Sequence, residues 1–133
     1  MPFGTATVLT NVGKAITAKR FIGTTPTQLE PKFLAIGTGA TTAARTAAAA
    51  DTALSTEVET RVGANAGTTV TTAVTNDTYQ VIQTITATGV RAVDEAGFFD
   101  ASSAGQMFIS ATFGVVTLQI GDSLQITGKV QYT

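Results

Sequence analysis

Apolar and polar side chains alternate most regularly in the last ten residues of the chain. Leu124, Ile126 and Val130 fall on one face, whereas the serine, glutamine, threonine and lysine residues between them fall on the other. A period of two is typical of a strand with one buried face and one face in water. The sequence therefore predicts that this segment is a strand of an antiparallel sheet.

A second alternating run covers residues 106–113, after the small polar turn 101–105. Met107 and Ile109 share one face of this run, and Phe108 alone breaks its alternation. Further strands are predicted for four segments, each bounded by glycine, proline or Asn-Asp turn signals. These segments are 32–36, 57–62, 69–74 and 79–89, and a further strand-like run covers residues 94–100.

One helix is predicted near the beginning of the chain. Leu9, Val12 and Ile16 follow the i, i+3, i+7 spacing of a helix with one apolar face. Lys19 and Arg20 occupy the last turn, where cations favour the helix dipole. Either Thr10 or Asn11 is suited to cap the helix start.

These elements predict a single, mainly β domain spanning residues 1–133. The expected architecture is an antiparallel β-sandwich or barrel-like domain with one short N-terminal helix. Residues 1–7 have no periodicity that ties them to the sheet, so we expect an extended N-terminal arm. Residues 40–53 are rich in alanine and threonine and interrupted by Arg45, so we expect an ordered surface loop that is able to lie on a neighbouring chain.

The composition argues against several classes of function. Charged residues make up 13% of the chain, about half the usual share in a soluble domain. The net charge of -1 and the lack of a basic run argue against nucleic-acid binding. No apolar stretch is long enough to cross a membrane, and without cysteine no disulfide framework exists.

Catalytic chemistry has few candidate residues. The absence of histidine and cysteine removes the commonest general base, the thiol nucleophile and the usual zinc ligands. Glu57 and Glu59 are predicted on one strand face together with Arg61, which favours a solvated face over an acid/base pair. Asp94 and Glu95 are adjacent and therefore predicted on opposite faces. We expect no enzyme, no cofactor and no metal site.

Several segments resemble a pattern found in small structural proteins of tailed bacteriophages. The matching segments are Asn11 to Ile16, Phe33 to Ala40, Asp51 to Leu54 with Glu57, Glu95 to Ala101, Met107 with Phe108, and Gly121 to Gln125. This family includes head decoration (cement) proteins and tail-fibre or collar proteins. The resemblance implies a virion component, made in the host cytoplasm, that has no catalytic residues to carry over.

The neutral, threonine-rich surface is also suited to repeated contact with other proteins. We expect a homo-oligomer, with a trimer favoured, that contacts the major capsid protein or other virion proteins and stabilises the head exterior through many weak contacts. The alternative is a tail, neck, baseplate or tail-fibre protein. The candidate contact residues are Pro2, Phe3, Lys19, Arg20, Phe21 and Arg45.

A carbohydrate-binding β-sandwich is a more remote alternative. Such a site usually stacks sugar rings on aromatic side chains, and the chain has no tryptophan. Only Tyr79 and Tyr132 remain for this purpose. The sequence therefore favours protein contact.

Overall fold

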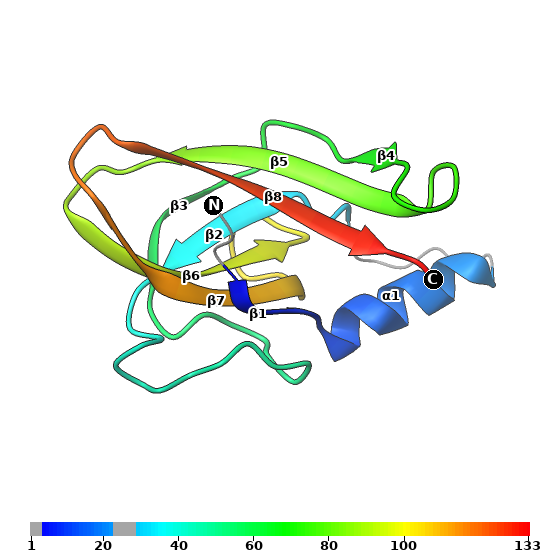
Figure 1. Cartoon of the computed structure of the whole chain (residues 1–133), viewed down its shortest axis with the longest axis horizontal. Coiled ribbons are helices and arrows are strands. Elements are labelled where there is room, and N and C mark those ends of the chain that lie inside the picture. The colour runs from blue at the N-terminus through cyan, green and yellow to red at the C-terminus, as the bar shows by residue number, and fades with distance from the viewer. Residues whose placement is uncertain (1–3, 23–28) are drawn as a thin grey trace.

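Two antiparallel β-sheets pack face to face, and the helix of the described residues lies at one end of them (Figure 1). The computed structural model describes residues 4–22 and 29–133. The elements in chain order are β1 (Gly4–Leu9), α1 (Asn11–Phe21), β2 (Phe33–Gly37), β3 (Glu57–Val62), β4 (Thr68–Val70), β5 (Thr78–Thr86), β6 (Arg91–Phe99), β7 (Met107–Leu118) and β8 (Ser123–Gln131). The predicted mainly β sandwich with one short N-terminal helix is confirmed.

The two sheets differ in width. The larger has the strand order β1-β7-β6-β2-β3, and the smaller has the order β4-β5-β8. Strand β5 lies over β2 and β3, and β8 lies over β7. Because β1 pairs with the far edge of β7, the larger sheet extends past β8 on that side.

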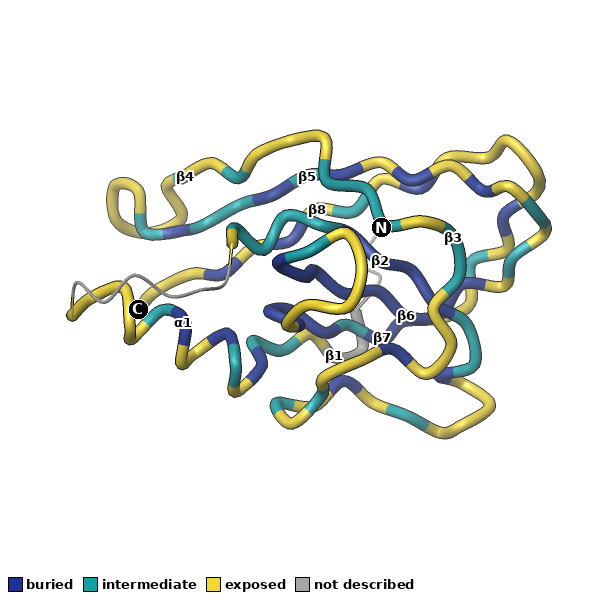
Figure 2. Tube along the Cα trace, turned by 180° about the vertical axis from the view of Figure 1, so that it is seen from behind, coloured by how far each residue is buried: buried dark blue, intermediate teal, exposed yellow. Residues whose placement is uncertain are grey.

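The main core fills the space between the sheets. Leu34, Ile36 and Phe98 of the larger sheet are buried there, together with Val81 and Ile85 of β5. Figure 2 shows that burial is concentrated in the central strands and that most exposed positions lie in loops and turns. The predicted alternation in β8 is confirmed, since its apolar face points inward and its polar face outward.

A smaller apolar cluster lies on the outer face of the larger sheet. It contains Ala35, Phe99 and Met107, covered by Leu54 from the segment between β2 and β3. The prediction that Met107 and Ile109 share a face is wrong. Phe99 pairs with Met107 whereas Phe98 pairs with Ile109, so a bulge in β7 adds one residue between them and turns Met107 to the other face.

The N-terminal segment also differs from the prediction. Residues 4–7, expected in a free arm, belong to β1, which pairs with β7 along the edge of the larger sheet. Its threonine and valine residues suit a strand, but no large side chain alternates along it to reveal one. Residues 1–3 of the expected arm lie outside the described residues.

The cap of α1 determines where the helix begins, and a close approach at Gly13 determines how it packs against β7. The Thr10 hydroxyl accepts a hydrogen bond of 3.0 Å from the Gly13 amide, which identifies the residue that caps α1. A side chain at Gly13 would come within 3.0 Å of Leu9 and of the Phe108 carbonyl. Glycine is therefore required for α1 to pack against β7, although it lowers helix propensity.

The alanine- and threonine-rich segment 40–53 is held against the larger sheet. The Asp94 carboxylate accepts hydrogen bonds from the Ala40 amide (3.1 Å) and the Thr41 amide (2.8 Å). The Glu95 carboxylate accepts one from the Thr56 amide (3.1 Å). Glu95 also accepts a hydrogen bond from Arg45 within the segment (2.6 Å), so both carboxylates bind it and do not lie on opposite faces as predicted. The pairing of β6 with β7 shifts register between Val93 and Glu95, and Val93 and Ala96 both belong to the main core, so the alternation of faces along β6 is interrupted at this point.

Candidate protein-binding groove

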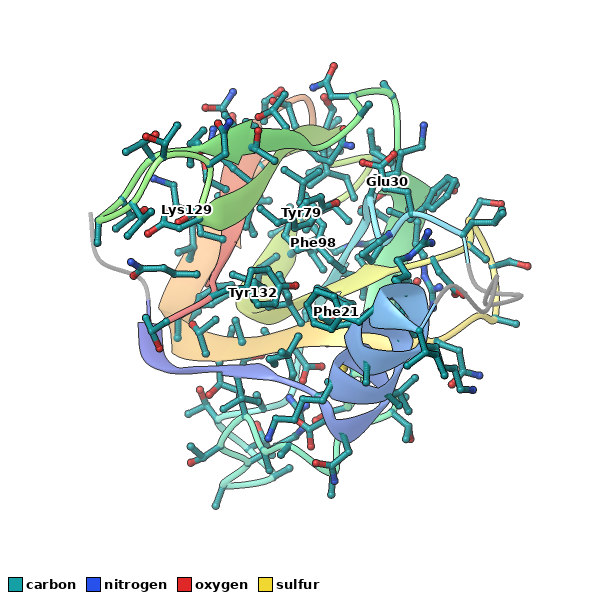
Figure 3. The ribbon with its side chains drawn as sticks, turned by 90° about the vertical axis from the view of Figure 1, so that its right-hand side faces the viewer. Phe21, Glu30, Tyr79, Phe98, Lys129 and Tyr132 are labelled. Carbon is teal, nitrogen blue, oxygen red and sulfur yellow. The ribbon has the colours of Figure 1, made fainter. Side chains whose placement is uncertain are left out.

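A groove of about 560 Å³ lies between the second half of α1 and the nearby end of the smaller sheet (Figure 3). We call it the α1 groove. Its volume is within the range of known ligand sites, and most of its lining is apolar. The lining residues are Ile16, Thr17, Arg20, Phe21, Glu30, Pro31, Asn76, Asp77, Tyr79, Phe108 and Tyr132.

The helical wall of the groove follows from the spacing of residues in α1. Ile16 points into the core and is 4% exposed, and Arg20 follows it one turn later on the same side. The Thr17 hydroxyl donates to the Gly13 carbonyl (3.1 Å) and shares a hydrogen bond of 3.3 Å with the Tyr132 hydroxyl. The end of the chain is thereby held against the helix.

The floor of the groove is aromatic. The rings of Tyr79 and Phe108 meet edge to face, with centroids 6.2 Å apart. The Tyr79 hydroxyl donates to Glu30 Oε1 and to the Pro31 carbonyl, both at 3.5 Å, and the Gly67 amide also donates to Glu30. Burial raises the pKa of Tyr79, and the charge of Glu30 raises it further. The phenol therefore stays protonated over the whole physiological range.

Asp77 forms a negatively charged rim where the β4–β5 hairpin turns. Its carboxylate accepts hydrogen bonds from the amides of Thr72, Ala73 and Val74 and from the Gln131 side chain, at 2.8–3.0 Å. These bonds, that from Val74 first among them, hold the pKa of Asp77 far below its usual value. The carboxylate is therefore ionised at any ordinary pH, and it links this turn to the end of β8.

Large apolar side chains are exposed around the mouth of the groove. Phe21 is 81% exposed and Ile22 is 76% exposed at the end of α1. Val74 is 68% exposed in the β4–β5 turn, and Tyr132 is 44% exposed. Exposed apolar surface around a concave, mostly apolar site is typical of a surface that binds another protein.

The chain matches no protein-family model, no curated protein and no solved structure. The site must therefore be interpreted from its own chemistry. Within residues 4–22 and 29–133, no group of three or more histidine, cysteine, aspartate or glutamate side chains is placed to hold a metal ion. In the same residues no helix has the length and apolar character needed to span a membrane.

The predicted contact residues occupy different places. Arg20 and Phe21 line the α1 groove, and Lys19 is exposed on the same helical turn but outside the lining. Pro2 and Phe3 lie outside the described residues. The remaining groove residues come from distant segments that only the fold brings together, so no local pattern in the sequence associates them with this site.

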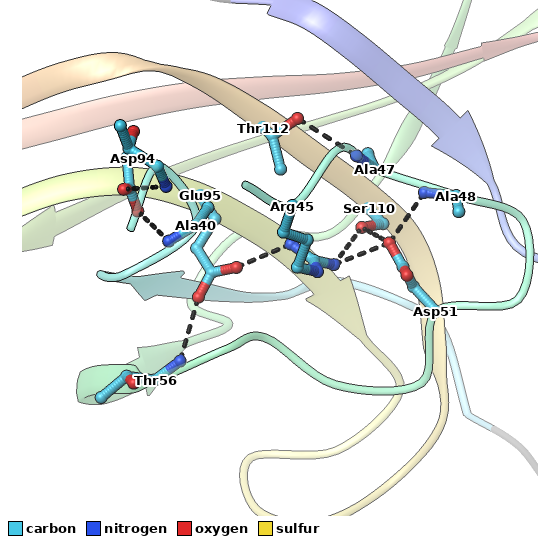
Figure 4. Close-up of polar contacts among 11 residues, drawn as sticks. Ala40, Arg45, Ala47, Ala48, Asp51, Thr56, Asp94, Glu95, Ser110 and Thr112 are labelled. Carbon is cyan, nitrogen blue, oxygen red and sulfur yellow. Dashed lines mark hydrogen bonds and ion pairs between the residues drawn. The ribbon is translucent and has the colours of Figure 1, made fainter. Parts of the chain in front are cut away.

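Arg45 lies on the other side of the larger sheet and is bound within the chain (Figure 4). Its guanidinium donates to Glu95 (2.6 Å), to Asp51 (2.7 Å) and to the Ser110 hydroxyl (3.1 Å). Ser110 in turn donates to Asp51 at 2.6 Å. The side chain of Glu95 is fully buried and that of Arg45 is mostly buried. The expectation that Arg45 contacts a partner stays a prediction, and within the chain its donors hold the segment 40–53 on the sheet.

The two glutamates of β3, Glu57 and Glu59, form separate ion pairs. Glu57 forms a two-pronged ion pair with Arg61, with distances of 2.7 and 2.9 Å. Glu59 has a positive φ of 63° and binds Arg91 (2.8 Å) and the Thr88 hydroxyl (2.7 Å). The two glutamates therefore bind different partners.

Proposed function

We propose that this protein is a non-enzymatic structural protein that acts by binding other proteins. The observation that carries the proposal is the α1 groove, where an apolar and aromatic lining adjoins the exposed Phe21 and Ile22. Leaving two large side chains in water is unfavourable, at roughly 25 cal/mol per Å² of apolar surface. A partner protein that covers them gains this energy and obtains an aromatic contact of the kind that dominates many interfaces.

We further propose that the partner is a virion protein of a tailed bacteriophage, most favourably the major capsid protein or a sister copy in a trimer. The support is the resemblance of the segments named above, together with the low charge of the chain. In this role the protein decorates the head exterior and stabilises the lattice through many weak contacts. A position in the tail, neck or baseplate is the alternative.

Variants of the groove test this proposal. Phe21→Ala removes an exposed ring at the mouth of the groove, and Ile120→Ala is its matched control, because Ile120 is 73% exposed in the turn between β7 and β8. Particles assembled with each variant are examined by electron microscopy for occupancy of the protein. We expect Phe21→Ala to lower occupancy and Ile120→Ala to leave it unchanged.

Two outcomes count against the proposal. Full occupancy of the Phe21→Ala variant would show that the groove is not part of the binding surface. Density on the tail instead of the head would favour the alternative location, and the absence of the protein from purified particles would exclude a virion role.

One observation favours a carbohydrate-binding role as a second candidate, because Tyr79 and Tyr132 line the same groove. However, Tyr79 packs edge-on against Phe108 and its hydroxyl is bonded to Glu30 and Pro31. Of the two tyrosines, only Tyr132 then offers a partly exposed ring for stacking. Chemical-shift changes of residues around Tyr132 on addition of simple sugars would support this second candidate, and unchanged spectra would exclude it.

A further inference from the structure

The edges of the two sheets are not equally protected. Strand β4 has only three residues, β1 has a register shift between Gly4 and Ala6, and β3 is distorted where Glu59 adopts a positive φ. Short, bulged or irregular edges resist pairing with another chain. Strand β8 is different, because its nine residues pair with β5 without any shift in register. Among the described strands, β8 is therefore the long and regular edge.

Hydrogen bonds just beyond both ends of β8 show which of its residues bond to β5. The Tyr132 amide donates to the Asp77 carbonyl and the Ala87 amide donates to the Asp122 carbonyl, both at 2.9 Å. Because bonded and non-bonded pairs alternate in an antiparallel ladder, the even-numbered residues of β8 bond to β5. The backbone groups of the odd-numbered residues point to the open edge. These residues are Ser123, Gln125, Thr127, Lys129 and Gln131, and all five are exposed.

An apolar cavity of about 350 Å³ lies beside this edge, between the two sheets. Leu124 and Ile126 of β8 line it from one sheet, and Phe98, Ile109 and Phe113 line it from the other. Thr7 of β1 also reaches it, which places the cavity where the larger sheet extends past β8. Figure 3 shows Phe98 between the two sheets and Lys129 on β8. A strand added to β8 would lie over this cavity.

We propose that the β8 edge binds one extended segment of a partner protein as a fourth strand of the smaller sheet. Main-chain hydrogen bonds to the five odd-numbered residues would provide affinity, and side chains of the alternate set would enter the cavity. The charge of β8 adds a specific requirement, because Lys129 is its single charged residue and is exposed. The segment therefore has apolar residues at alternate positions and an acidic residue opposite Lys129.

The strand order argues for a lone segment over the β8 strand of a second copy. If two copies paired through β8, the β8 strand of the second copy would be the added strand. The β7 and β1 strands of that second copy would then lie beneath it. That space is already occupied by β1 of the first copy, since β1 lies beyond β7 in the larger sheet. A single extended segment has no second layer and avoids this overlap. This inference concerns a surface separate from the α1 groove, and it does not depend on a role in virions.

The test uses a synthetic nine-residue peptide in which threonine and valine alternate, with one glutamate in place of a threonine. In the proposed pairing the threonine and glutamate amides point to β8 and the valine amides point away. One form of the peptide is N-methylated on the valines, which leaves the pairing edge intact and prevents self-association. The matched control is N-methylated on the threonines and the glutamate, which removes every donor that faces β8.

Calorimetry with the full chain is expected to show binding of the first peptide, at least about 100-fold tighter than the control, because several main-chain hydrogen bonds are lost together. The Thr127→Pro variant removes one amide that faces the open edge and leaves the ladder to β5 intact. It should bind the first peptide about tenfold more weakly than the Thr127→Val variant. Thermal melting verifies that both variants are folded.

Three results would overturn the proposal. The first is equal binding of the two methylated peptides, or no binding of either at millimolar concentration. The second is binding that leaves the amides of the odd-numbered residues unprotected from hydrogen exchange. The third is protection of those amides in the protein alone as its concentration rises, which would assign the edge to a second copy.

Discussion

Gly128 of β8 lies close against the ring of Phe98 in the larger sheet. A Cβ atom there would lie 2.7 and 2.9 Å from two ring atoms of Phe98, well inside van der Waals contact. We expect Gly128→Ala to displace this ring and to lower the free energy of unfolding by about 1–3 kcal/mol, as overpacking does in other cores. Urea denaturation measures the change.

Gly114 provides the control for this substitution. It lies in β7, and a Cβ atom added there meets nothing within 4 Å. Gly114→Ala should change the free energy of unfolding by less than about 0.5 kcal/mol. Equal effects of the two substitutions would mean that the loss comes from the strand backbone and not from contact with Phe98.

The Asp77 carboxylate makes stability depend on pH in the acid range. Its pKa is lowered in the folded protein by four hydrogen bonds, so it stabilises the fold at pH values above its unfolded pKa of about 4. This contribution is lost progressively as the pH falls below about 4. Asp77→Asn should therefore melt at a lower temperature than the parent at pH 7, and the gap should narrow towards pH 2. Thermal melts across this range measure it, and a constant gap would contradict the assignment.

At the scale of elements, the buried ion pair of Arg45 and Glu95 secures the segment between β2 and β3. Arg45→Met would leave the fully buried Glu95 carboxylate without its cation, at a cost of about 3–5 kcal/mol. The double variant Arg45→Met with Glu95→Gln should recover part of this loss, because the buried charge is then removed. Chemical denaturation compares the parent, the two single variants Arg45→Met and Glu95→Gln, and the double variant, and additive losses would show that the two side chains do not act as a pair.

Long alternating segments allowed most elements to be predicted from the sequence. The bounds of β3 agree with its predicted range, and the inward face of β8 agrees residue by residue. Phe108 marked the bulge only as a break in the alternation, because the change of face at Met107 depends on how β7 pairs with β6. Asp94 and Glu95 were misplaced for the same reason. Strand β1 was missed because an edge strand of small residues has little periodicity.

The α1 groove was predictable only in part. Arg20 and Phe21 were recognised as contact candidates because they end the helix. Tyr79, Phe108 and Tyr132 belong to three different segments, and their meeting depends on the packing of two sheets against α1. No local pattern in the sequence records such a meeting.

At the scale of the whole molecule, the exposed apolar side chains at the end of α1 predict self-association. Burying Phe21 and its neighbours between copies would form a closed assembly, with a trimer favoured. Sedimentation at micromolar concentration should show this assembly for the parent and for Ile120→Ala, and a shift towards monomer for Phe21→Ala. A parent protein that stays monomeric up to millimolar concentration would contradict this expectation.

The attachment of residues 40–53 has a consequence for the sequences that this fold tolerates. The Asp94 carboxylate accepts hydrogen bonds from two main-chain amides of the segment. A main-chain amide can donate such a bond whatever side chain its residue carries. Thr42 and Ala43 are exposed between these attachments and Arg45. The identity of these two side chains is therefore free to change, and substitutions at either position that keep the main-chain amide should leave the fold intact. The segment can thus vary in sequence on the surface while residues far away in the chain keep its backbone in place.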